Sequence, residues 1–235
     1  MSFIITVYTN EGIIMASDSR TTYTTTINLP DGNVEKHIGT QTTDSTYKTF
    51  ICNKRIGIST CGTADISGKP IAGFIERFIA EKTSDESTVT EIANGLLTYF
   101  SQFDPKPSVN FIVAGYNPDS QQSISRVFVA TNQILPINTA VAGTVWDGEA
   151  EVFQKVVKHI ALKNDNGTYT DYPPRSIGFN FFTLQDAIDF AEYAVDITIK
   201  TMYFQDYVNT VGGPIDILAI KPSGTFWIQR KELHA

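Results

Sequence analysis

The chain opens with MSFIITVYTNEGIIMASDSR, residues 1–20, in which two short apolar runs flank a polar turn. Phe3 to Tyr8 and Gly12 to Ser17 are rich in β-branched and other apolar residues. Two such runs separated by a tight turn predict a β-hairpin. The second run ends at Asp18, and Arg20 follows closely, so the hairpin is expected to place a carboxylate and a guanidinium at the end of a strand.

The composition is typical of an acidic protein with a sizeable core. The chain has 235 residues, 42% of them hydrophobic, so we expect one domain spanning residues 1–235. A net charge of −7 disfavours nucleic acid and anionic membranes as partners, because both require a basic face. There is no apolar stretch of bilayer length and no secretory signal pattern. We therefore expect a cytoplasmic protein with no nucleic-acid or membrane partner.

The chain contains two cysteines, Cys52 and Cys61, with no CxxC spacing. Two distant cysteines indicate neither a disulfide framework nor a zinc site. The histidines are few and scattered as well. We expect buried thiols and no metal.

The next part of the chain predicts two further hairpins. Tyr23 to Tyr47 is rich in threonine and has a turn sequence at its centre, Leu29 to Asn33, which predicts an inserted hairpin that projects from the domain. Lys48 to Cys52 and Ile56 to Thr60 flank a polar pair and predict another. The segment from Cys61 to Asp65 should then turn the chain into a helix.

Helices are predicted in two consecutive pairs, with strands between and after them. The first pair has an apolar stripe from Ile71 to Ile79 and a second stripe that follows a capping-box spacing, Thr88 to Glu91. The second pair has candidate caps at Asp147 and Thr183. The remaining predicted strands are Asn110–Tyr116, Ser123–Ala130, Ile215–Ile220 and Thr225–Gln229.

This order does not suit a parallel doubly wound sheet, in which strands and helices alternate singly. Clustered strands and paired helices instead favour an α+β fold. We expect a four-layer αββα sandwich, in which two antiparallel sheets lie between two helix pairs.

Three segments resemble proteasome β-type subunits. They are GIIMASDSRTT, KTFICNKRIGISTCGTAD and VGGPIDILAI, which occur in the family's order, and the resemblance extends from residue 2 to about residue 225. The family consists of N-terminal-nucleophile (Ntn) hydrolases. The resemblance implies a hydroxyl nucleophile on the first residue of the mature chain, a lysine and an aspartate beside it, and assembly into rings.

The resemblance places the catalytic group on Ser2, Asp18 and Lys48. The spacing from Ser2 to Asp18 equals the family's spacing from nucleophile to aspartate. The family usually has threonine where this chain has Ser2. Lys48 matches the family's lysine across the inserted hairpin, and a slip of one residue would put Tyr47 there instead.

Five further residues are candidates for binding or supporting roles by the same resemblance. Cys61 and Gly62 occupy the turn whose backbone N–H forms the family's oxyanion hole, and Arg20 lies near the expected substrate pocket. Thr144 is the nearest hydroxyl to the position of a supporting serine, and Asp206 could stand for a second aspartate.

The predicted function is therefore a cytoplasmic peptidase that cleaves amide bonds of peptides or unfolded polypeptide in a homo-oligomeric ring. Removal of Met1 would free the Ser2 amine to act as base, and no cofactor is required. An ATPase or regulatory protein is a further candidate partner. Two alternatives remain open: a non-catalytic proteasome-like structural subunit, and an Ntn amidase that acts on small acylated compounds.

Overall fold

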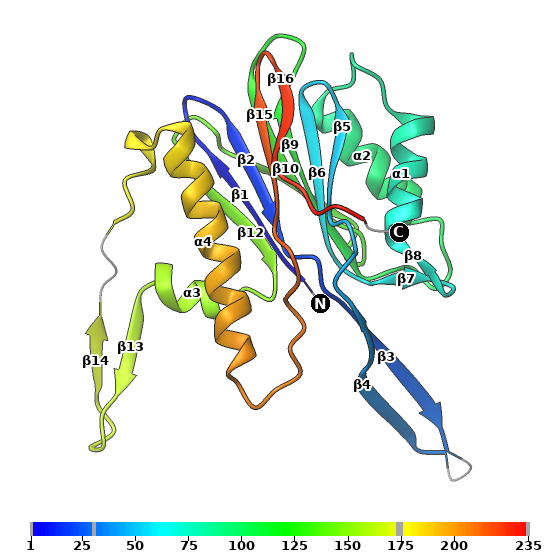
Figure 1. Cartoon of the computed structure of the whole chain (residues 1–235), viewed down its shortest axis with the longest axis vertical. Coiled ribbons are helices and arrows are strands. Elements are labelled where there is room, and N and C mark those ends of the chain that lie inside the picture. The colour runs from blue at the N-terminus through cyan, green and yellow to red at the C-terminus, as the bar shows by residue number, and fades with distance from the viewer. Residues whose placement is uncertain (1, 30–31, 173–175, 234–235) are drawn as a thin grey trace.

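The computed structural model describes residues 2–29, 32–172 and 176–233, and two five-stranded sheets form its centre (Figure 1). Every strand pair in them is antiparallel. The first sheet has the order β12-β1-β2-β15-β16, with bounds Gly143–Gly148, Phe3–Tyr8, Ile13–Ser17, Asp216–Lys221 and Gly224–Gln229. The second has the order β11-β10-β9-β6-β5, with bounds Gln133–Ile137, Gln122–Phe128, Val109–Tyr116, Ile56–Gly62 and Thr49–Asn53.

The opening hairpin forms as the sequence predicts. β1 and β2 pair with Ile4 opposite Ser17 and Tyr8 opposite Ile13, and every residue of both strands is buried. Burial on both faces explains why the two runs are continuously apolar and do not alternate with polar residues.

Helices α1 (Ile71–Lys82) and α2 (Val89–Phe100) pack against the second sheet. Ile75 and Phe78 of α1 join Leu96 and Phe100 of α2 in one buried cluster with residues of β5, β6 and β9. Thr88 caps α2, and the reciprocal contact from Glu91 completes the predicted capping box.

Helices α3 (Glu151–Val157) and α4 (Leu184–Tyr203) pack against the first sheet, on the opposite side of the strands from α1 and α2 (Figure 1). Thr183 caps α4, as expected. The expected cap of α3 at Asp147 is wrong: the cap position is Ala150, and the Asp147 carboxylate instead accepts a hydrogen bond from Arg126.

A third cluster of buried residues lies between the two sheets. Ile4 and Met15 of the first sheet belong to it, together with Ile112 and Ala114 of the second. Gly57 makes close approach possible here, because a Cβ at this position would lie 2.8 Å from the Met15 sulfur. The two sheets therefore pack face to face, as dense protein cores require.

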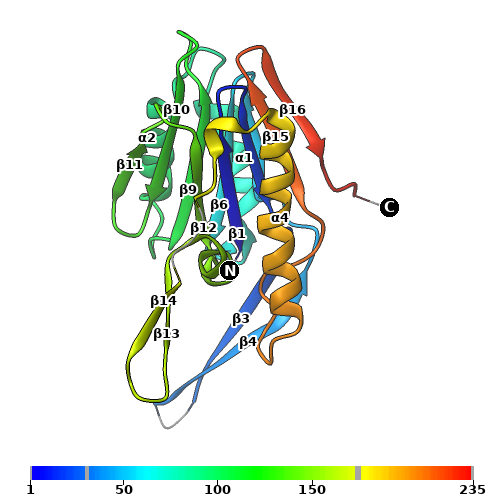
Figure 2. The ribbon, with the colours of Figure 1, turned by 90° about the vertical axis from the view of Figure 1, so that its left-hand side faces the viewer.

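The predicted inserted hairpin is present as β3 (Thr21–Asn28) and β4 (Val34–Thr43); Pro30 and Asp31 of its turn lie outside the described residues. A second hairpin, β13 (Ile160–Lys163) with β14 (Tyr169–Tyr172), was not predicted. Both project from the end of the sheets at which β1 begins (Figures 1 and 2). The shorter elements are β7 (Asp65–Ile66), β8 (Lys69–Pro70) and the 3₁₀ turn Phe179–Phe181.

None of the helices in the described parts of the chain combines the length and apolar character needed to cross a bilayer.

Candidate active site

Asp18 is the centre of the site, and its side chain is completely buried. Oδ1 accepts hydrogen bonds from Phe3 N (3.0 Å) and Lys48 Nζ (2.7 Å), and Oδ2 accepts from Arg20 N (3.1 Å) and Gly212 N (3.0 Å). Three of these donors are backbone groups from separate segments. The carboxylate therefore ties the start of β1, the end of β2 and the loop before β15 together, and its one side-chain partner is the Lys48 ammonium.

Lys48 is the residue that the fold pairs with Asp18, and Tyr47 is not. The Lys48 side chain is 3% exposed, and its ammonium donates to Asp18 and to the Arg20 carbonyl. Burial lowers the pKa of Lys48 below its usual value, while the attraction of Asp18 opposes that shift. The ammonium is thus both buried and held in a fixed direction.

Buried hydroxyl groups fix the backbone on which both residues lie. Ser17 directly precedes Asp18, and Thr49 directly follows Lys48. Thr49 Oγ1 donates to Ser17 Oγ at 2.9 Å and lies 3.0 Å from Ser59 Oγ, so β5 is linked to both β2 and β6. These contacts join the two sheets at the residues next to the ion pair.

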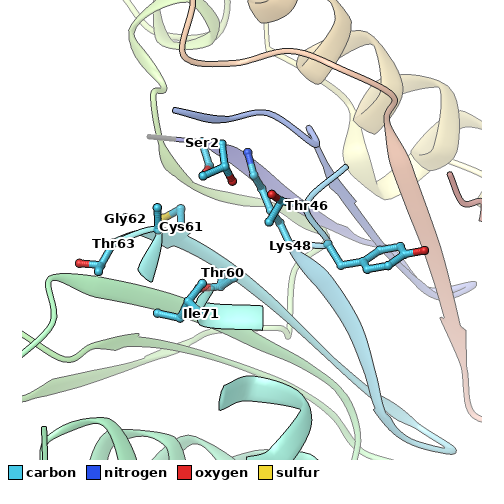
Figure 3. Close-up of a pocket in the computed structure, with 11 residues that line it drawn as sticks. Ser2, Thr46, Lys48, Thr60, Cys61, Gly62, Thr63 and Ile71 are labelled. Atoms are coloured by element: carbon cyan, nitrogen blue, oxygen red, sulfur yellow. The ribbon is translucent and has the colours of Figure 1, made fainter. Parts of the chain in front are cut away.

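Ser2 is buried and lines a cavity together with Lys48, Cys61, Gly62, Thr21 and Thr46. Figure 3 shows the Lys48 nitrogen pointing toward Ser2, with Cys61 and Gly62 across the space from it. The cavity measures about 20 Å³, which is room for about one water molecule. Ser2, Lys48 and the turn at Cys61 and Gly62 therefore meet in one place, although Ser2 and Lys48 lie 46 positions apart in the sequence.

Cys61 and Gly62 form the end of β6. Burial raises the pKa of the Cys61 thiol well above its usual value, and Asp147 raises it further, while Lys48 and Arg126 act in the opposite direction. The thiol is therefore protonated near neutral pH and does not compete as a nucleophile. Gly62 has φ +104°, and a Cβ there would lie 2.3 Å from the Ser108 carbonyl oxygen, so only glycine fits this turn.

Arg20 does not line the cavity. Its Nε and one terminal nitrogen each donate to Asp44 at 2.7 Å, which raises the pKa of Arg20 and lowers the pKa of Asp44. Gly212 leaves room for the guanidinium, because a Cβ there would lie 2.7 Å from Cζ. The part of Arg20 that joins the site is its carbonyl, which accepts from Lys48.

Two candidates from the sequence are not brought to the site. Thr144 lies in β12 opposite Val7, and its hydroxyl donates to the Thr6 carbonyl at 3.0 Å. Four residues of strand, or about 13 Å, separate it from Gly148, the β12 residue that lies beside Ser2. Asp206 is exposed in the turn after α4.

Sequence analysis missed two residues that adjoin the site, Asp147 and Gly148. Gly148 has φ +89°, and a Cβ there would lie 1.9 Å from the Ser2 carbonyl oxygen and 3.4 Å from Cys61 Cβ. Asp147 accepts a hydrogen bond from Arg126 at 2.8 Å and from the Gly148 N–H at 2.7 Å. The available signal was the Asp-Gly pair, which is typical of the end of a strand, whereas the sequence analysis interprets Asp147 as a helix cap.

No group of three or more His, Cys, Asp or Glu side chains within the described residues has an arrangement that could hold a metal ion. The chemistry that the site itself offers is a hydroxyl, an ammonium, a carboxylate and backbone N–H groups around a small cavity. These are the components of nucleophilic amide hydrolysis.

No family model matches the chain, and no curated protein sequence matches it either. Solved structures do match. The Anbu protein of Hyphomicrobium sp. strain MC1 is 14% identical, with a TM-score of 0.61 over 97% of this chain and 86% of that one, and its Gly-1 mutant gives a TM-score of 0.62 at 13% identity over 97% and 87%. The Anbu protein of Yersinia bercovieri, described as an ancestral beta-subunit, is 13% identical, with a TM-score of 0.63 over 98% and 88%. The chain therefore shares the fold of the Anbu proteins.

Proposed function

We propose that this chain is a proteasome-like Ntn hydrolase in which Ser2 is the nucleophile. The observation that carries the proposal is the buried Lys48–Asp18 ion pair, whose ammonium points toward Ser2 across a cavity that Ser2 lines. The proposal requires removal of Met1, which lies outside the described residues. The small side chain at position 2 is compatible with that removal.

In the proposed reaction, the freed amine of Ser2 takes the proton of the Ser2 hydroxyl. An α-amine titrates near pH ~8, close enough to neutrality for this task. The Lys48 ammonium, held by Asp18, lowers the pKa of that amine by like-charge repulsion and stabilises the alkoxide. The alkoxide attacks the substrate carbonyl, the amine then protonates the departing nitrogen, and water releases the acyl group from Ser2.

The oxyanion of the tetrahedral intermediate is proposed to bind backbone N–H groups at Cys61 and Gly62. Both residues line the cavity opposite Lys48, and the positive φ of Gly62 keeps this turn in one conformation. A single oxyanion donor contributes about 3 kcal/mol to transition-state stabilisation in comparable sites. Arg20 contributes through its carbonyl and not through its guanidinium.

The proposed substrate is a peptide or unfolded polypeptide, cleaved in the cytoplasm by a homo-oligomeric ring of this chain, with an ATPase or regulatory protein as a further partner. The supporting observation is the shared fold with an Anbu protein that is described as an ancestral beta-subunit. The fold itself we propose to be one domain of the four-layer Ntn type, supported by three buried clusters, one between the sheets and one under each helix pair.

Each of the two other functions has an observation in its favour. A non-catalytic subunit is favoured by the distance of Thr144 from the cavity and the exposure of Asp206, because the supporting groups expected there are missing. An amidase for small acylated compounds would use the same hydroxyl, ammonium and backbone N–H groups, all of which border this cavity.

One experiment tests the main proposal. The protein is purified from its own host, the mass of its amino-terminal peptide is measured, and hydrolysis of fluorogenic peptide amides and of small N-acyl amines is assayed. We expect Met1 to be absent and peptide hydrolysis to vanish in Ser2→Ala but not in Ser2→Thr. Ser223→Ala, an exposed turn serine, is the matched control and should retain full activity. Retained Met1, or equal activity in Ser2→Ala, would contradict the proposal, and turnover of N-acyl amines alone would favour the amidase.

A further inference from the structure

A second buried ammonium–carboxylate pair lies beside the first, and neither sequence analysis nor the proposed reaction uses it. Lys231 follows β16 and is 8% exposed, while Asp216 begins β15 and is completely buried. The Lys231 ammonium donates to Asp216 Oδ2, and the Lys231 backbone N–H donates to Oδ1 at 2.8 Å. Both carboxylate oxygens of Asp216 are therefore bound by one residue.

The register of the first sheet places this pair next to Asp18. Asp216 lies opposite Ser17 in the pairing of β15 with β2, and Asp18 is the next residue of that chain segment. Asp18 and Asp216 therefore occupy neighbouring backbone positions, and Asp18 is one of the charges that act on Lys231; each carboxylate has its own lysine.

The Lys231 ammonium also reaches the segment that carries Lys48. It lies 4.3 Å from the centroid of the Tyr47 ring, and the Arg230 guanidinium lies 4.8 Å from the same ring. Tyr47 directly precedes Lys48 and lines the cavity. The chain after β16 is thus packed against the first residues of the β5 segment, where a cation gains from the face of the ring.

The charged and titratable groups around this cluster come from five segments. They are Asp216 of β15, Asp18 and Arg20 after β2, Tyr47 and Lys48 before β5 with Asp44 further upstream, and Arg230 beside Lys231 itself; Cys61 of β6 faces Lys48. Burial lowers the pKa of Lys231, while Asp216 and then Asp18 oppose that shift. The pKa of Lys48 is lowered first by burial, and the positive charge of Lys231 adds to the lowering.

We propose that Lys231 is a positioning residue of the site: its buried ammonium, held by Asp216 against the Tyr47 ring, places a second fixed positive charge beside the segment that carries Lys48. Lys231 does not line the cavity and touches no reacting atom, so it acts through Lys48. The consequence for hydrolysis rests on the proposed function, whereas the effect on Lys48 can be measured without any activity. A purely structural role, in which Lys231 only fastens the end of the chain, predicts no effect on Lys48.

The test is an NMR titration of Lys48 in protein labelled on its lysine side chains, with the Lys48 signal assigned by its loss in Lys48→Arg. The main variant is Lys231→Met combined with Asp216→Asn, which removes both charges and leaves no unpaired buried carboxylate. We expect its Lys48 midpoint to rise relative to the unmodified chain, because Lys231, and not Asp216, is among the charges that act on Lys48. Lys231→Arg keeps the charge and should leave the midpoint unchanged.

An unchanged Lys48 midpoint in the folded double variant would overturn the proposal. If that variant does not fold, Lys231→Gln alone decides, because its amide can still donate to Asp216 while the positive charge is gone: the Lys48 midpoint should rise, and a fall or no change would contradict the proposal. Where the chain hydrolyses peptides through the Lys48 ammonium, the basic limb of the kcat/KM profile should move to higher pH in the double variant. A shifted midpoint in a chain without any hydrolytic activity would sustain this inference and refute the proposed function.

Discussion

Lys48 is a buried lysine, and burial disfavours the charged form of its side chain. Moving an ammonium out of water costs several kcal/mol, and the chain offsets this with one carboxylate and one carbonyl oxygen. The same burial keeps water from screening the ammonium, so its field acts strongly on the cavity that Ser2 lines. Function and stability therefore depend on the same contact, because removing either partner leaves the other buried and unpaired.

The first prediction concerns Asp18→Asn. This change leaves the Lys48 ammonium buried without its counter-charge, so we expect a loss of about 3–5 kcal/mol in the free energy of unfolding, measured by urea denaturation. Peptide hydrolysis, if the proposed function holds, should fall at least about 100-fold. Asp206→Asn is the matched control, because Asp206 is exposed and distant from the cavity, and it should change neither quantity. Near-normal stability of Asp18→Asn would show that Lys48 reaches solvent.

The second prediction compares two glycines with positive φ. Gly148 (φ +89°) has the Ser2 carbonyl oxygen 1.9 Å from its would-be Cβ, whereas Gly68 (φ +74°) has nothing within 4 Å. Gly68→Ala should therefore cost only the conformational strain of about 1–2 kcal/mol. Gly148→Ala should cost clearly more and displace Ser2, with a matching loss of activity. Equal unfolding free energies for the two variants would mean that β12 can move away from Ser2 at no cost.

The part of the site that the sequence predicted depends on short segments, and the part that it did not depends on strand pairing. Asp18 and Lys48 each lie at a recognisable strand end, so the resemblance placed both. Asp147 adjoins Cys61 only because β12 pairs with β1 across more than 130 residues of sequence, a contact that no local pattern encodes. The position of the Lys231–Asp216 pair beside this site was not predicted for the same reason, because it depends on the pairing of β15 with β2.

At the scale of elements, prediction succeeded where burial or capping left a local signature. The predicted capping box of α2 has its reciprocal contact, Thr183 caps α4, and β1 and β2 are the fully buried strands that their apolar runs indicate. β11, β13 and β14 were missed because most or all of their residues are exposed or half-buried, so no apolar pattern marks them. The helix α3 is present, but its predicted cap at Asp147 was wrong. A helix of seven residues has too few apolar positions for its period to locate the first residue.

The third prediction concerns the pH dependence of the α2 cap. Glu91 accepts hydrogen bonds from the Thr88 backbone N–H at 2.8 Å and from the Thr88 hydroxyl at 3.0 Å, and these lower the pKa of Glu91 below 4.5. A carboxyl whose folded pKa is lowered stabilises the fold fully above its unfolded pKa and loses this effect as the pH falls through the folded value. The difference in unfolding free energy between the unmodified chain and Glu91→Gln should therefore be largest above pH 4.5 and shrink in acid.

Urea denaturation at neutral and at acidic pH measures this difference. Glu76→Gln is the control, because Glu76 is exposed on α1 and takes no part in a cap. A Glu91→Gln difference that is constant from neutral pH to pH ~3 would show that the ionised carboxylate does not hold the cap.

Of the side chains that the structure describes, none from β3, β4, β13 or β14 belongs to the three buried clusters. The two hairpins extend beyond the packed layers at the end where the site lies (Figures 1 and 2). An isolated two-stranded hairpin is marginal in water, so a surface that stabilises such an extension has to come from another chain or from the hairpin's own polar contacts. For the β3–β4 hairpin, the proposed ring of identical chains would supply such a surface from a neighbouring chain.

The fourth prediction follows for the β3–β4 hairpin. Thr25 lies opposite His37 in the pairing, so replacing residues 26–36 with Asn-Gly should close the shortened hairpin with a two-residue turn. Because the described side chains of the removed part belong to none of the buried clusters, we expect the free energy of unfolding per chain to change by less than about 1 kcal/mol. Sedimentation velocity should show multiples of 26.0 kDa for the unmodified chain and a shift toward the single chain after shortening. An equivalent shortening of the β13–β14 turn, residues 164–168, serves as the comparison: if it disperses the assembly and the β3–β4 change does not, the contact between subunits lies on the other hairpin.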